Sequence, residues 1–227
     1  MPDGYFIAGT DTGVGKTLAA QALLTALVGR GRRVAGMKPV ASGCRLTAAG
    51  LRSEDAEALI AAANVTAPYA EVNPYAFAPA VAPHLAARVG GAEIRLEPIV
   101  QAYARLADCA DCIVVEGAGG WLTPISETLT MADVAAALGL PVVLVVGLRL
   151  GCLNHALLTQ RAIAQCGLPL AGWVANSIES EMERRDENLA TLTRRLGAAP
   201  LAVFPRSAQP NSTPFVQQLA RMLVLPD

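Results

Sequence analysis

A glycine-rich segment near the N-terminus has the residue types that bind phosphate groups. It reads Gly-Thr-Asp-Thr-Gly-Val-Gly-Lys-Thr over residues 9–17 and lies between an apolar run of strand length and a stretch of helix length. Its glycines allow backbone N–H groups to turn toward a phosphate, and the helix N-terminus adds its positive dipole. Lys16 can reach β- and γ-phosphate oxygens, and Thr17 offers a hydroxyl to Mg²⁺. The segment therefore predicts a site for nucleotide phosphates.

This loop departs by one position from the common spacing. A strict G-x4-G-K-[ST] motif would place glycine at position 10, where Thr10 stands. The segment is therefore a relative of the standard loop. A glycine-rich turn that binds nothing is the alternative, and the register of strand, loop, Lys-Thr pair and helix disfavours it.

Two acidic side chains are candidates to hold the metal ion of a triphosphate. Glu116 ends an apolar strand and precedes Gly-Ala-Gly-Gly at residues 117–120, which places it at the carboxyl edge of the sheet, where open α/β proteins bind ligands. A simple turn at this Glu is the alternative. Asp55 stands at a predicted helix start, where an acidic residue usually caps the helix, so alone it indicates little.

The basic residues are unevenly divided between two types. Of the 18 Lys and Arg, two are lysines, Lys16 and Lys38, which leaves 18 − 2 = 16 arginines. An ammonium is a compact point charge that fits between phosphate oxygens, whereas a guanidinium is a broad planar fork. Chance is the alternative, but one lysine lies in the glycine-rich loop and the other at the end of a predicted strand. Lys38 is therefore a second candidate for binding anions.

The elements that position these residues alternate along the chain, which predicts a mainly parallel sheet with helices on both faces. The predicted strands are residues 5–9, 33–38, 112–116, 141–147, 170–176 and 201–204. The predicted helices are residues 16–28, 53–64, 83–89, 97–106, 131–138, 154–165, 181–196 and 214–223. Residues 66–83, rich in proline, form the one long irregular segment, which is expected to be functional. Residues 1–227 are expected to form a single α/β domain.

Composition narrows the class of protein. Hydrophobic residues make up 53% and charged residues 16%, against about 25% charged in typical soluble domains, so an oligomer is plausible. The net charge of −1 lacks the basic excess that binds nucleic acid, and the most apolar stretch, residues 134–148, is too short to span a membrane. The N-terminus has no basic region or cleavage-like site, so the protein is expected in the cytoplasm, with its five cysteines as thiols.

Six segments together resemble one family. They are residues 9–17, Met-Lys-Pro-Val-Ala-Ser-Gly at 37–43, Asn-Pro-Tyr-Ala-Phe at 73–77, Val-Glu-Gly-Ala-Gly-Gly-Trp at 115–121, Leu-Gly-Cys-Leu-Asn-His at 150–155 and Gly-Trp-Val-Ala-Asn at 172–176. The family is the dethiobiotin synthetases of biotin biosynthesis, and the match covers most of residues 5–176 and fades beyond them. Many ATPases share the phosphate loop, but the segments around Lys38 and Glu116 are more specific. The resemblance implies a P-loop NTPase-like fold.

The resemblance also implies a reaction, the ATP-dependent closure of a cyclic urea. It would convert 7,8-diaminononanoate, CO₂ and ATP to dethiobiotin, ADP and phosphate. One amine takes up CO₂ as a carbamate, the carbamate attacks the γ-phosphate, and the second amine displaces phosphate from the mixed anhydride. Because carbamate and triphosphate are both anions, the site needs positive charge on each.

By the same resemblance, residue roles can be carried over position by position. Lys16, Lys38, Thr12 and Ser42 would act on the reacting groups, with Ser42 also contacting the diamine, and Thr17, Asp55 and Glu116 would hold Mg²⁺. The residues implied to bind ATP are Gly13, Val14, Gly15, Lys16, Thr17, Leu18, Asp55, Glu116, Gly117, Ala118, Gly119, Asn176, Ser177, Pro205, Arg206 and Ser207.

A further segment is a candidate to bind the carboxylate of the diamine. Gly151, Cys152, Leu153 and Asn154 open a predicted helix whose first N–H groups are unpaired. In the family this segment comes from the partner subunit, so the resemblance implies a homodimer with shared sites. The match departs at Gly13, where relatives often carry Glu, and it is poor after residue 205.

Other functions remain as alternatives. A nucleotide-switched partitioning or scaffold ATPase of the same superfamily usually has a second lysine early in the loop, where this chain has Asp11 and Thr12. An amidotransferase-like ligase acting on cobyrinate would need a glutaminase region, for which 227 residues leave no room. The histidines His84 and His155 have no acid or thiol at ligand spacing, and the C-x-x-C spacing of residues 109–112 has no second pair, so neither predicts a metal site.

Overall fold

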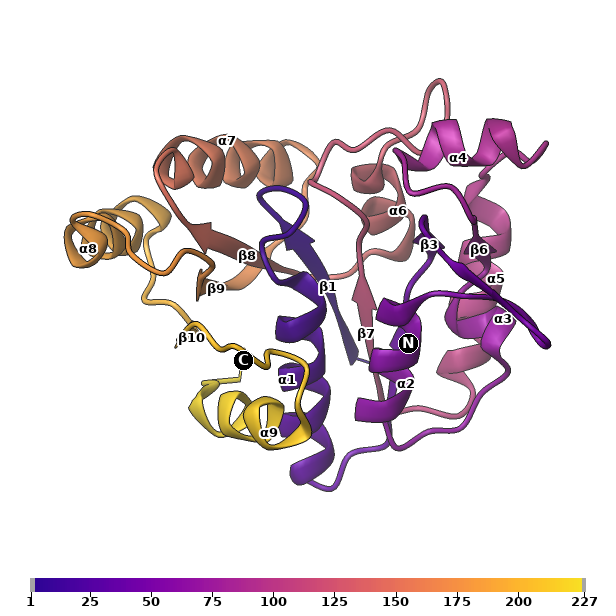
Figure 1. Ribbon diagram of the computed structural model, residues 1–227, viewed down its shortest axis with the longest axis horizontal. Coiled ribbons are helices and arrows are strands. Elements are labelled where there is room, and N and C mark those ends of the chain that lie inside the picture. Colours follow the sequence, from indigo (N-terminus) through magenta and orange to yellow (C-terminus); the bar gives the residue numbers. More distant parts are fainter. Residues whose placement is uncertain (1–2, 226–227) are drawn as a thin grey trace.

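Six parallel strands form the central sheet of the computed structural model, which describes residues 3–225. Their order is β10-β9-β8-β1-β7-β2, and helices cover both faces (Figure 1). The strands are β1 (Asp3–Gly9), β2 (Val34–Met37), β7 (Cys112–Glu116), β8 (Val142–Leu148), β9 (Leu170–Ser177) and β10 (Ala202–Phe204). The helices are α1 (Lys16–Gly29), α2 (Glu54–Ala62), α3 (Tyr69–Val72), α4 (Pro83–Val89), α5 (Leu96–Ala107), α6 (Met131–Leu138), α7 (Cys152–Gln165), α8 (Arg185–Leu196) and α9 (Thr213–Met222). The predicted fold class is confirmed.

The sheet is buried on both faces because its strands alternate side chains between two cores. Ile7 and Val114 point into the core that α1 and α9 cover, whereas Phe6 and Val115 point into the core beneath α5, α6, α7 and α8. All seven residues of β8 are buried. Strands of this kind read as continuous apolar runs, which is why the sequence places all six to within two residues.

The carboxyl ends of the strands meet at one edge of the sheet. Ile7 lies opposite Glu116 in the pairing of β1 with β7, and Gly147 lies opposite Asn176 in the pairing of β8 with β9. The N–H of Thr10 donates to the carbonyl oxygen of the neighbouring strand β8 at 3.0 Å. The loops that follow β1, β2, β7 and β9 therefore open at the edge where α/β proteins bind ligands.

The prediction of one irregular segment over residues 66–83 is wrong in part. The segment contains α3 and the strand β6 (Tyr75–Ala76), which pairs in parallel with β3 (Val40–Ala41). A hairpin of β4 (Arg45–Thr47) and β5 (Gly50–Arg52) follows β3. Elements of two to four residues carry too little periodicity to be found in a sequence.

Two helices begin two or more residues away from their predicted starts. The α8 helix begins at Arg185 and not at residue 181, because Arg184 has a left-handed φ of 54°, which ends the helical path toward the N-terminus. The α7 helix begins at Cys152, two residues before the predicted start, after Gly151 with φ of 95°. Gly151 is therefore the N-cap of α7, and the other three residues of the carboxylate-binding candidate, Cys152 to Asn154, form its first turn.

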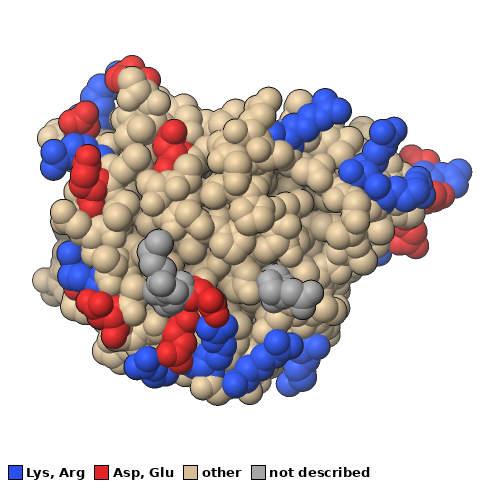
Figure 2. All heavy atoms as spheres, turned by 180° about the vertical axis from the view of Figure 1, so that it is seen from behind, with Lys and Arg blue, Asp and Glu red and all other residues tan. Residues whose placement is uncertain are grey.

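The surface agrees with the low charge of the sequence. Figure 2 shows the face opposite to that of Figure 1, where acidic and basic side chains gather at the margins of an uncharged centre. Within residues 3–225, no helix is both long and apolar enough to cross a membrane. All five cysteines are free thiols, as predicted.

Candidate active site

A cavity of about 1090 Å³ opens at the carboxyl edge of the sheet. Its volume is large enough for a nucleotide and a second small molecule. Most of the predicted site residues line it, namely Thr12, Gly13, Gly15, Lys16, Thr17, Leu18, Lys38, Ser42, Asp55, Glu116, Ala118, Gly119, Asn176, Ser177, Pro205, Arg206 and Ser207. Residues that are up to 195 positions apart in the chain thus face one space.

The remaining predicted residues do not line the cavity. Val14 is buried in the core beside α1, and the N–H of Gly117 donates to the carbonyl oxygen of Ile7 at 3.1 Å. These two residues therefore hold the loops in place. Residues 151–154 lie at the start of α7, outside the cavity of their own chain.

Two glycines with left-handed backbone angles shape the phosphate loop. Gly13 and Gly15 have left-handed φ angles of 76° and 95°. A Cβ at Gly15 would lie 2.2 Å from Nδ2 of Asn176, and that Nδ2 donates to the carbonyl oxygen of Val14 at 2.9 Å. Asn176 therefore packs directly against the loop from the end of β9.

Lys16 lies in this loop without a carboxylate partner among residues 3–225. Its side chain is buried, and its Nζ donates to the main-chain oxygen of Asp11 at 3.0 Å. Burial, together with the charge of Lys38, lowers the pKa of Lys16 to about 8. An anion bound beside this ammonium would relieve that cost.

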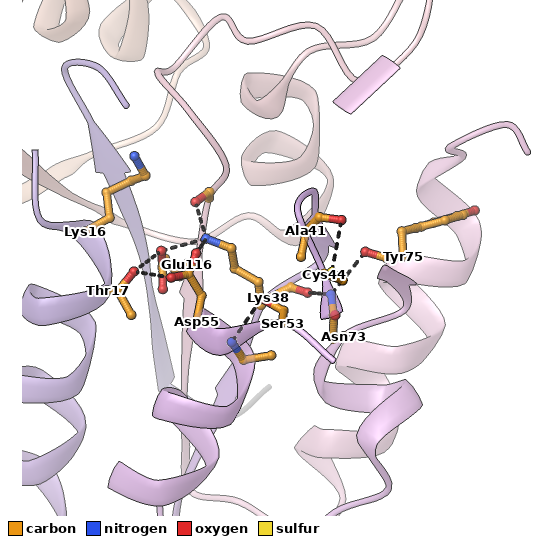
Figure 3. Close-up of polar contacts among 12 residues, drawn as sticks. Lys16, Thr17, Lys38, Ala41, Cys44, Ser53, Asp55, Asn73, Tyr75 and Glu116 are labelled. Atoms are coloured by element: carbon orange, nitrogen blue, oxygen red, sulfur yellow. Dashed lines mark hydrogen bonds and ion pairs between the residues drawn. The ribbon is translucent and has the colours of Figure 1, made fainter. Parts of the chain in front are cut away.

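Lys38 lies at the centre of a charged cluster at the ends of β2 and β7 (Figure 3). Its Nζ is 2.6 Å from Oε1 of Glu116, 2.8 Å from Oδ2 of Asp55 and 3.1 Å from the carbonyl oxygen of Gly117. The ammonium therefore has one acceptor for each of its three N–H bonds. In Figure 3, Lys38, Asp55, Glu116 and Thr17 point toward one another, whereas the side chain of Lys16 points away from them.

The protonation of this cluster follows from burial and pairing. Burial alone would lower the pKa of Lys38, but the carboxylates of Glu116 and Asp55 outweigh it and raise that pKa above its usual range. Burial raises the pKa of Glu116 despite the nearby ammonium. Burial opposes ionisation of Asp55 too, yet Lys38 and Thr17 lower its pKa below the usual range. The cluster therefore keeps a positive Lys38 and a negative Asp55.

The donor set fits a magnesium ion, which the resemblance implies. Oγ1 of Thr17 lies 2.9 Å from Oδ1 of Asp55 and 2.8 Å from Oε1 of Glu116. The buried Oε2 of Glu116 has no hydrogen-bond partner within residues 3–225. Mg²⁺ is commonly held by one or two carboxylates with waters and phosphate oxygens, so two carboxylates and a hydroxyl suffice. The described residues contain no cluster of three or more His, Cys, Asp and Glu suited to a metal.

A hydrogen-bonded chain that the sequence analysis left without a role positions Lys38. Nδ2 of Asn73 donates to the carbonyl oxygen of Lys38 at 2.7 Å, and the hydroxyl of Tyr69 donates to Oδ1 of Asn73 at 3.1 Å. The same hydroxyl accepts from the N–H of Ser53, which caps α2 beside Asp55. The Asn-Pro pair in the loop was the signal for Asn73, but nothing in the sequence indicates its partners.

Sequence reasoning also missed part of the cavity wall. These lining residues are Val40, Ala41, Glu54, Ala58, Ala80, Val81, Ala82, Pro83, Thr123, Pro124, Ile178, Pro210, Asn211 and Phe215. Residues 80–83 belong to the proline-rich segment expected to be functional. Among the predicted residues, Ser42 has a buried Oγ without a partner in the described part of the chain. A buried hydroxyl without a partner is available to a ligand.

Comparison with known proteins finds relatives that share one name. A family model described as AAA domain matches residues 3–212. An ATP-dependent dethiobiotin synthetase of Xanthomonas oryzae is 54% identical over 196 residues, which are 86% of this chain and 88% of the relative. The protein of that name from Ralstonia nicotianae is 53% identical over 207 residues, which are 91% and 90% of the two chains.

Solved structures with a similar fold are more distant in sequence. The MinC:MinD cell division protein complex of Aquifex aeolicus matches with a TM-score of 0.58 and 16% identity, over 96% of this chain and 86% of that chain. A ParA family ATPase from Chlorobium tepidum matches with a TM-score of 0.57 and 12% identity, over 98% and 91% of the two chains. At these identities the likeness shows the fold alone, which is that of ParA and MinD-type P-loop NTPases.

Proposed function

The chain belongs to the ATP-dependent dethiobiotin synthetase family and is an ATP-dependent ligase, and from that premise we propose which of its residues carry each step. In the proposed sequence, one amine nitrogen of 7,8-diaminononanoate bonds to CO₂ and loses a proton, giving a carbamate. A carbamate oxygen attacks the γ-phosphorus of ATP, and ADP leaves. The second amine then attacks the carbamoyl carbon and loses a proton, and inorganic phosphate leaves as the ring closes.

The observation that carries these assignments is the presence of Lys16 and Lys38, both buried, in one cavity. Carbamate and triphosphate repel each other, so charge stabilisation and positioning are most of what a protein contributes to the transfer. Burial strengthens the field of an ammonium because less water screens it. Sixteen of the 18 basic residues are arginine, yet both buried cations of the cavity are lysine.

Lys16 takes the β- and γ-phosphates in this proposal. Its ammonium has a neutral main-chain oxygen as its partner in the described structure, and a phosphate oxygen is the stronger acceptor. The N–H groups of the loop, opened by Gly13 and Gly15, surround the same phosphates. The nucleoside is assigned to the part of the cavity wall formed by Asn176, Ser177, Pro205, Arg206 and Ser207.

Lys38 takes the carbamate and the transferring phosphoryl group, and this role requires it to change partners. Its three N–H bonds are directed at Glu116, Asp55 and the carbonyl oxygen of Gly117, so none is free for a substrate. Mg²⁺ held by Thr17, Asp55 and Glu116 would supply charge neutralisation at the phosphates. If these carboxylates held the ion, they would no longer hold Lys38, and its ammonium would be free to contact the carbamate and the phosphoryl group.

Two hydroxyls complete the proposed diamine site. Ser42 Oγ is buried and unpartnered within residues 3–225, so an amine or carbamate can bond to it without displacing a protein group. Thr12 is exposed in the phosphate loop and lines the cavity beside Lys16. Both hydroxyls can therefore orient the nitrogen atoms at the reacting end of the diamine.

The far end of the diamine is assigned to the partner in a homodimer. Residues 151–154 would bind its carboxylate with the N–H groups of Leu153 and Asn154, because the N–H of Cys152 already donates to the carbonyl oxygen of Arg149 at 3.1 Å. These residues lie outside the cavity of their own chain. Leu150 beside them is 93% exposed, and Leu122 after the loop of β7 is 60% exposed. Apolar side chains this exposed next to a proposed site support an interface there.

Two coarser proposals accompany this reaction. Residues from the phosphate loop to Phe215 line one cavity, which supports a single P-loop NTPase-like domain over residues 1–227, apart from the ends that lie outside the described residues. The need for ATP, which cells keep inside, supports a place in the cytoplasm. No nucleic acid or membrane partner is part of the proposal.

The test is to supply the purified protein with diamine, ¹³C-bicarbonate, Mg²⁺ and ATP. The expected product is heavier than the diamine by one labelled carbonyl less two hydrogens, with one phosphate released per ring formed. Phosphate release that ignores the diamine would contradict the proposal. The matched control is Lys38→Met, which removes the proposed carbamate cation and should leave nucleotide binding in place.

A further inference from the structure

Asp11 connects the phosphate loop to the segment that enters α7. Its Oδ2 lies 2.5 Å from Nη2 of Arg149, and its Oδ1 accepts from the N–H of Thr12 at 2.7 Å. Its main-chain oxygen accepts from Nζ of Lys16 at 3.0 Å. The carbonyl oxygen of Arg149 in turn accepts from the N–H of Cys152 at 3.1 Å. Asp11 therefore contacts two proposed substrate-binding residues, Thr12 and Lys16, and through Arg149 it is connected to the start of α7.

The ion pair of Asp11 and Arg149 contributes little to the stability of the fold, so its effect is on the position of the segments that it joins. The side chain of Asp11 is 46% exposed and that of Arg149 is 34% exposed, and half-exposed ion pairs contribute little to the free energy of unfolding. The N–H of Thr12, with the Arg149 guanidinium, lowers the pKa of Asp11 despite partial burial, so the carboxylate is ionised at neutral pH. The ion pair of Asp11 and Arg149 is therefore charged and directional but contributes little to the free energy of unfolding.

Few polar contacts fix the entrance of α7, residues 149–154, although Cys152 is buried in the core and Leu153 packs against it. Leu150 is almost fully exposed, and Gly151 adopts a left-handed φ of 95°. The first turn of α7 has no side-chain cap. Arg149 is the residue of this entrance that bonds through its side chain to another element, as far as residues 3–225 show.

We propose that Asp11 and Arg149 are positioning residues, whose ion pair holds the α7 entrance at a fixed distance from the phosphate loop. The proposal rests on the proposed function, in which residues 151–154 bind the diamine carboxylate. In a homodimer with shared sites, the pair ties the phosphate loop of one subunit to the carboxylate site that serves the other. A displaced carboxylate site would misplace the amines, and small misplacements are costly in a reaction that depends on positioning.

The first test is Arg149→Gln, measured by steady-state kinetics on the full chain with Mg²⁺ and ATP. The KM for the diamine should rise about tenfold, whereas the KM for ATP stays within about twofold and kcat at saturating diamine changes little. The melting temperature should stay unchanged because the pair is half exposed. Arg149→Lys, which keeps a cation near Asp11, should recover most of the diamine affinity.

The second test asks whether the two residues act as a pair. Asp11→Asn keeps an oxygen for the N–H of Thr12 but removes the charge, and it should raise the diamine KM as much as Arg149→Gln does. The double variant should then be no worse than either single variant. The control is Arg33→Gln, which breaks a more exposed ion pair with Asp111, away from the cavity, and should leave the diamine KM unchanged.

Three outcomes would overturn the inference. They are a diamine KM within twofold of the parent in Arg149→Gln, additive effects in the double variant, and equal losses of diamine and ATP affinity with a lower melting temperature. The last outcome would indicate a merely structural pair. A parent protein that forms no dethiobiotin would instead contradict the proposed function, so the two failures are distinguishable.

Discussion

The two lysines of the cavity have opposite surroundings. Lys16, at the start of α1, is buried against a main-chain oxygen, and burial together with the charge of Lys38 lowers its pKa to about 8. Lys38, at the end of β2, is buried against two carboxylates, which overcome the effect of burial and raise its pKa. The two lysines of one cavity thus differ in their partners: carboxylates neutralise the charge of Lys38, whereas Lys16 is bonded to a neutral oxygen.

This difference predicts that the two lysines bind anionic ligands in different ways. Lys16 is a buried cation without an anionic partner in the described part of the chain, so a phosphate bound beside it would stabilise the loop. Lys38 is already neutralised by the protein, so it binds a substrate anion only after its own carboxylates are engaged elsewhere. In the proposed mechanism, the phosphate loop therefore binds its ligand without rearrangement, whereas Lys38, assigned to phosphoryl transfer, must first change partners.

The largest expected effect comes from Lys38→Arg. A planar guanidinium cannot place a point charge among Glu116, Asp55 and the two reactants, so ring closure should fall by about a thousandfold or more. The measurement is dethiobiotin formation by mass spectrometry. Because Lys16 is untouched, ATP should still bind, as calorimetry can establish, and circular dichroism should show an unchanged fold. Activity within a few-fold of the parent would remove Lys38 from the proposed mechanism.

The next effect concerns Glu116, the carboxylate that pairs with Lys38 and is proposed to bind Mg²⁺ as well. Glu116→Gln keeps the shape of the side chain but removes its charge, so the Mg²⁺ concentration for half-maximal activity should rise about thirtyfold. A titration of activity against Mg²⁺ at fixed ATP measures the change. The buried Oε2 of Glu116, unpartnered within residues 3–225, is the atom whose loss this test reports. An unchanged titration would exclude Glu116 as a ligand.

A third experiment sharpens the comparison without any reaction. If Lys38 and a divalent ion compete for Asp55 and Glu116, Lys38→Met should tighten binding of Mn²⁺ to the nucleotide-free protein about tenfold. Lys16→Met removes an equal charge from the same cavity but touches neither carboxylate, so it should tighten Mn²⁺ binding only about twofold. Electron paramagnetic resonance of free Mn²⁺ gives both affinities. Equal effects would mean that Lys38 acts through space and does not occupy the ion's position.

The sequence predicts the parts of this site that depend on strand ends. Glu116 and Asn176 end long apolar runs, and parallel strands bring such ends to one edge, so their proximity follows from pattern alone. The phosphate loop is predicted for the same reason, because it joins a strand to a helix. These features need only the fold class to be correct.

The contacts around Lys38 could not be predicted in this way. Its hold by Asn73 depends on α3 and β6, which are four and two residues long and lack a detectable period. The Asp11 and Arg149 ion pair joins residues 138 positions apart through two loops, whose course no periodicity records. Asp55 became a site residue by resemblance alone, since an acidic residue at a helix start is usually a cap.

The smallest expected effect is the pH dependence of Lys16. Since its pKa is lowered to about 8, the ammonium is charged below pH 8 and neutral above it, and a triphosphate favours the charged form. The affinity for ATP without Mg²⁺ should therefore fall about fourfold between pH 7 and pH 8.5. Stability of the free protein should change in the opposite sense, rising from pH 8 toward 10.5, because the unfolded chain binds the proton more tightly. Lys16→Met should bind ATP weakly at every pH without this slope, and a slope that survives the substitution would assign the titration to another group.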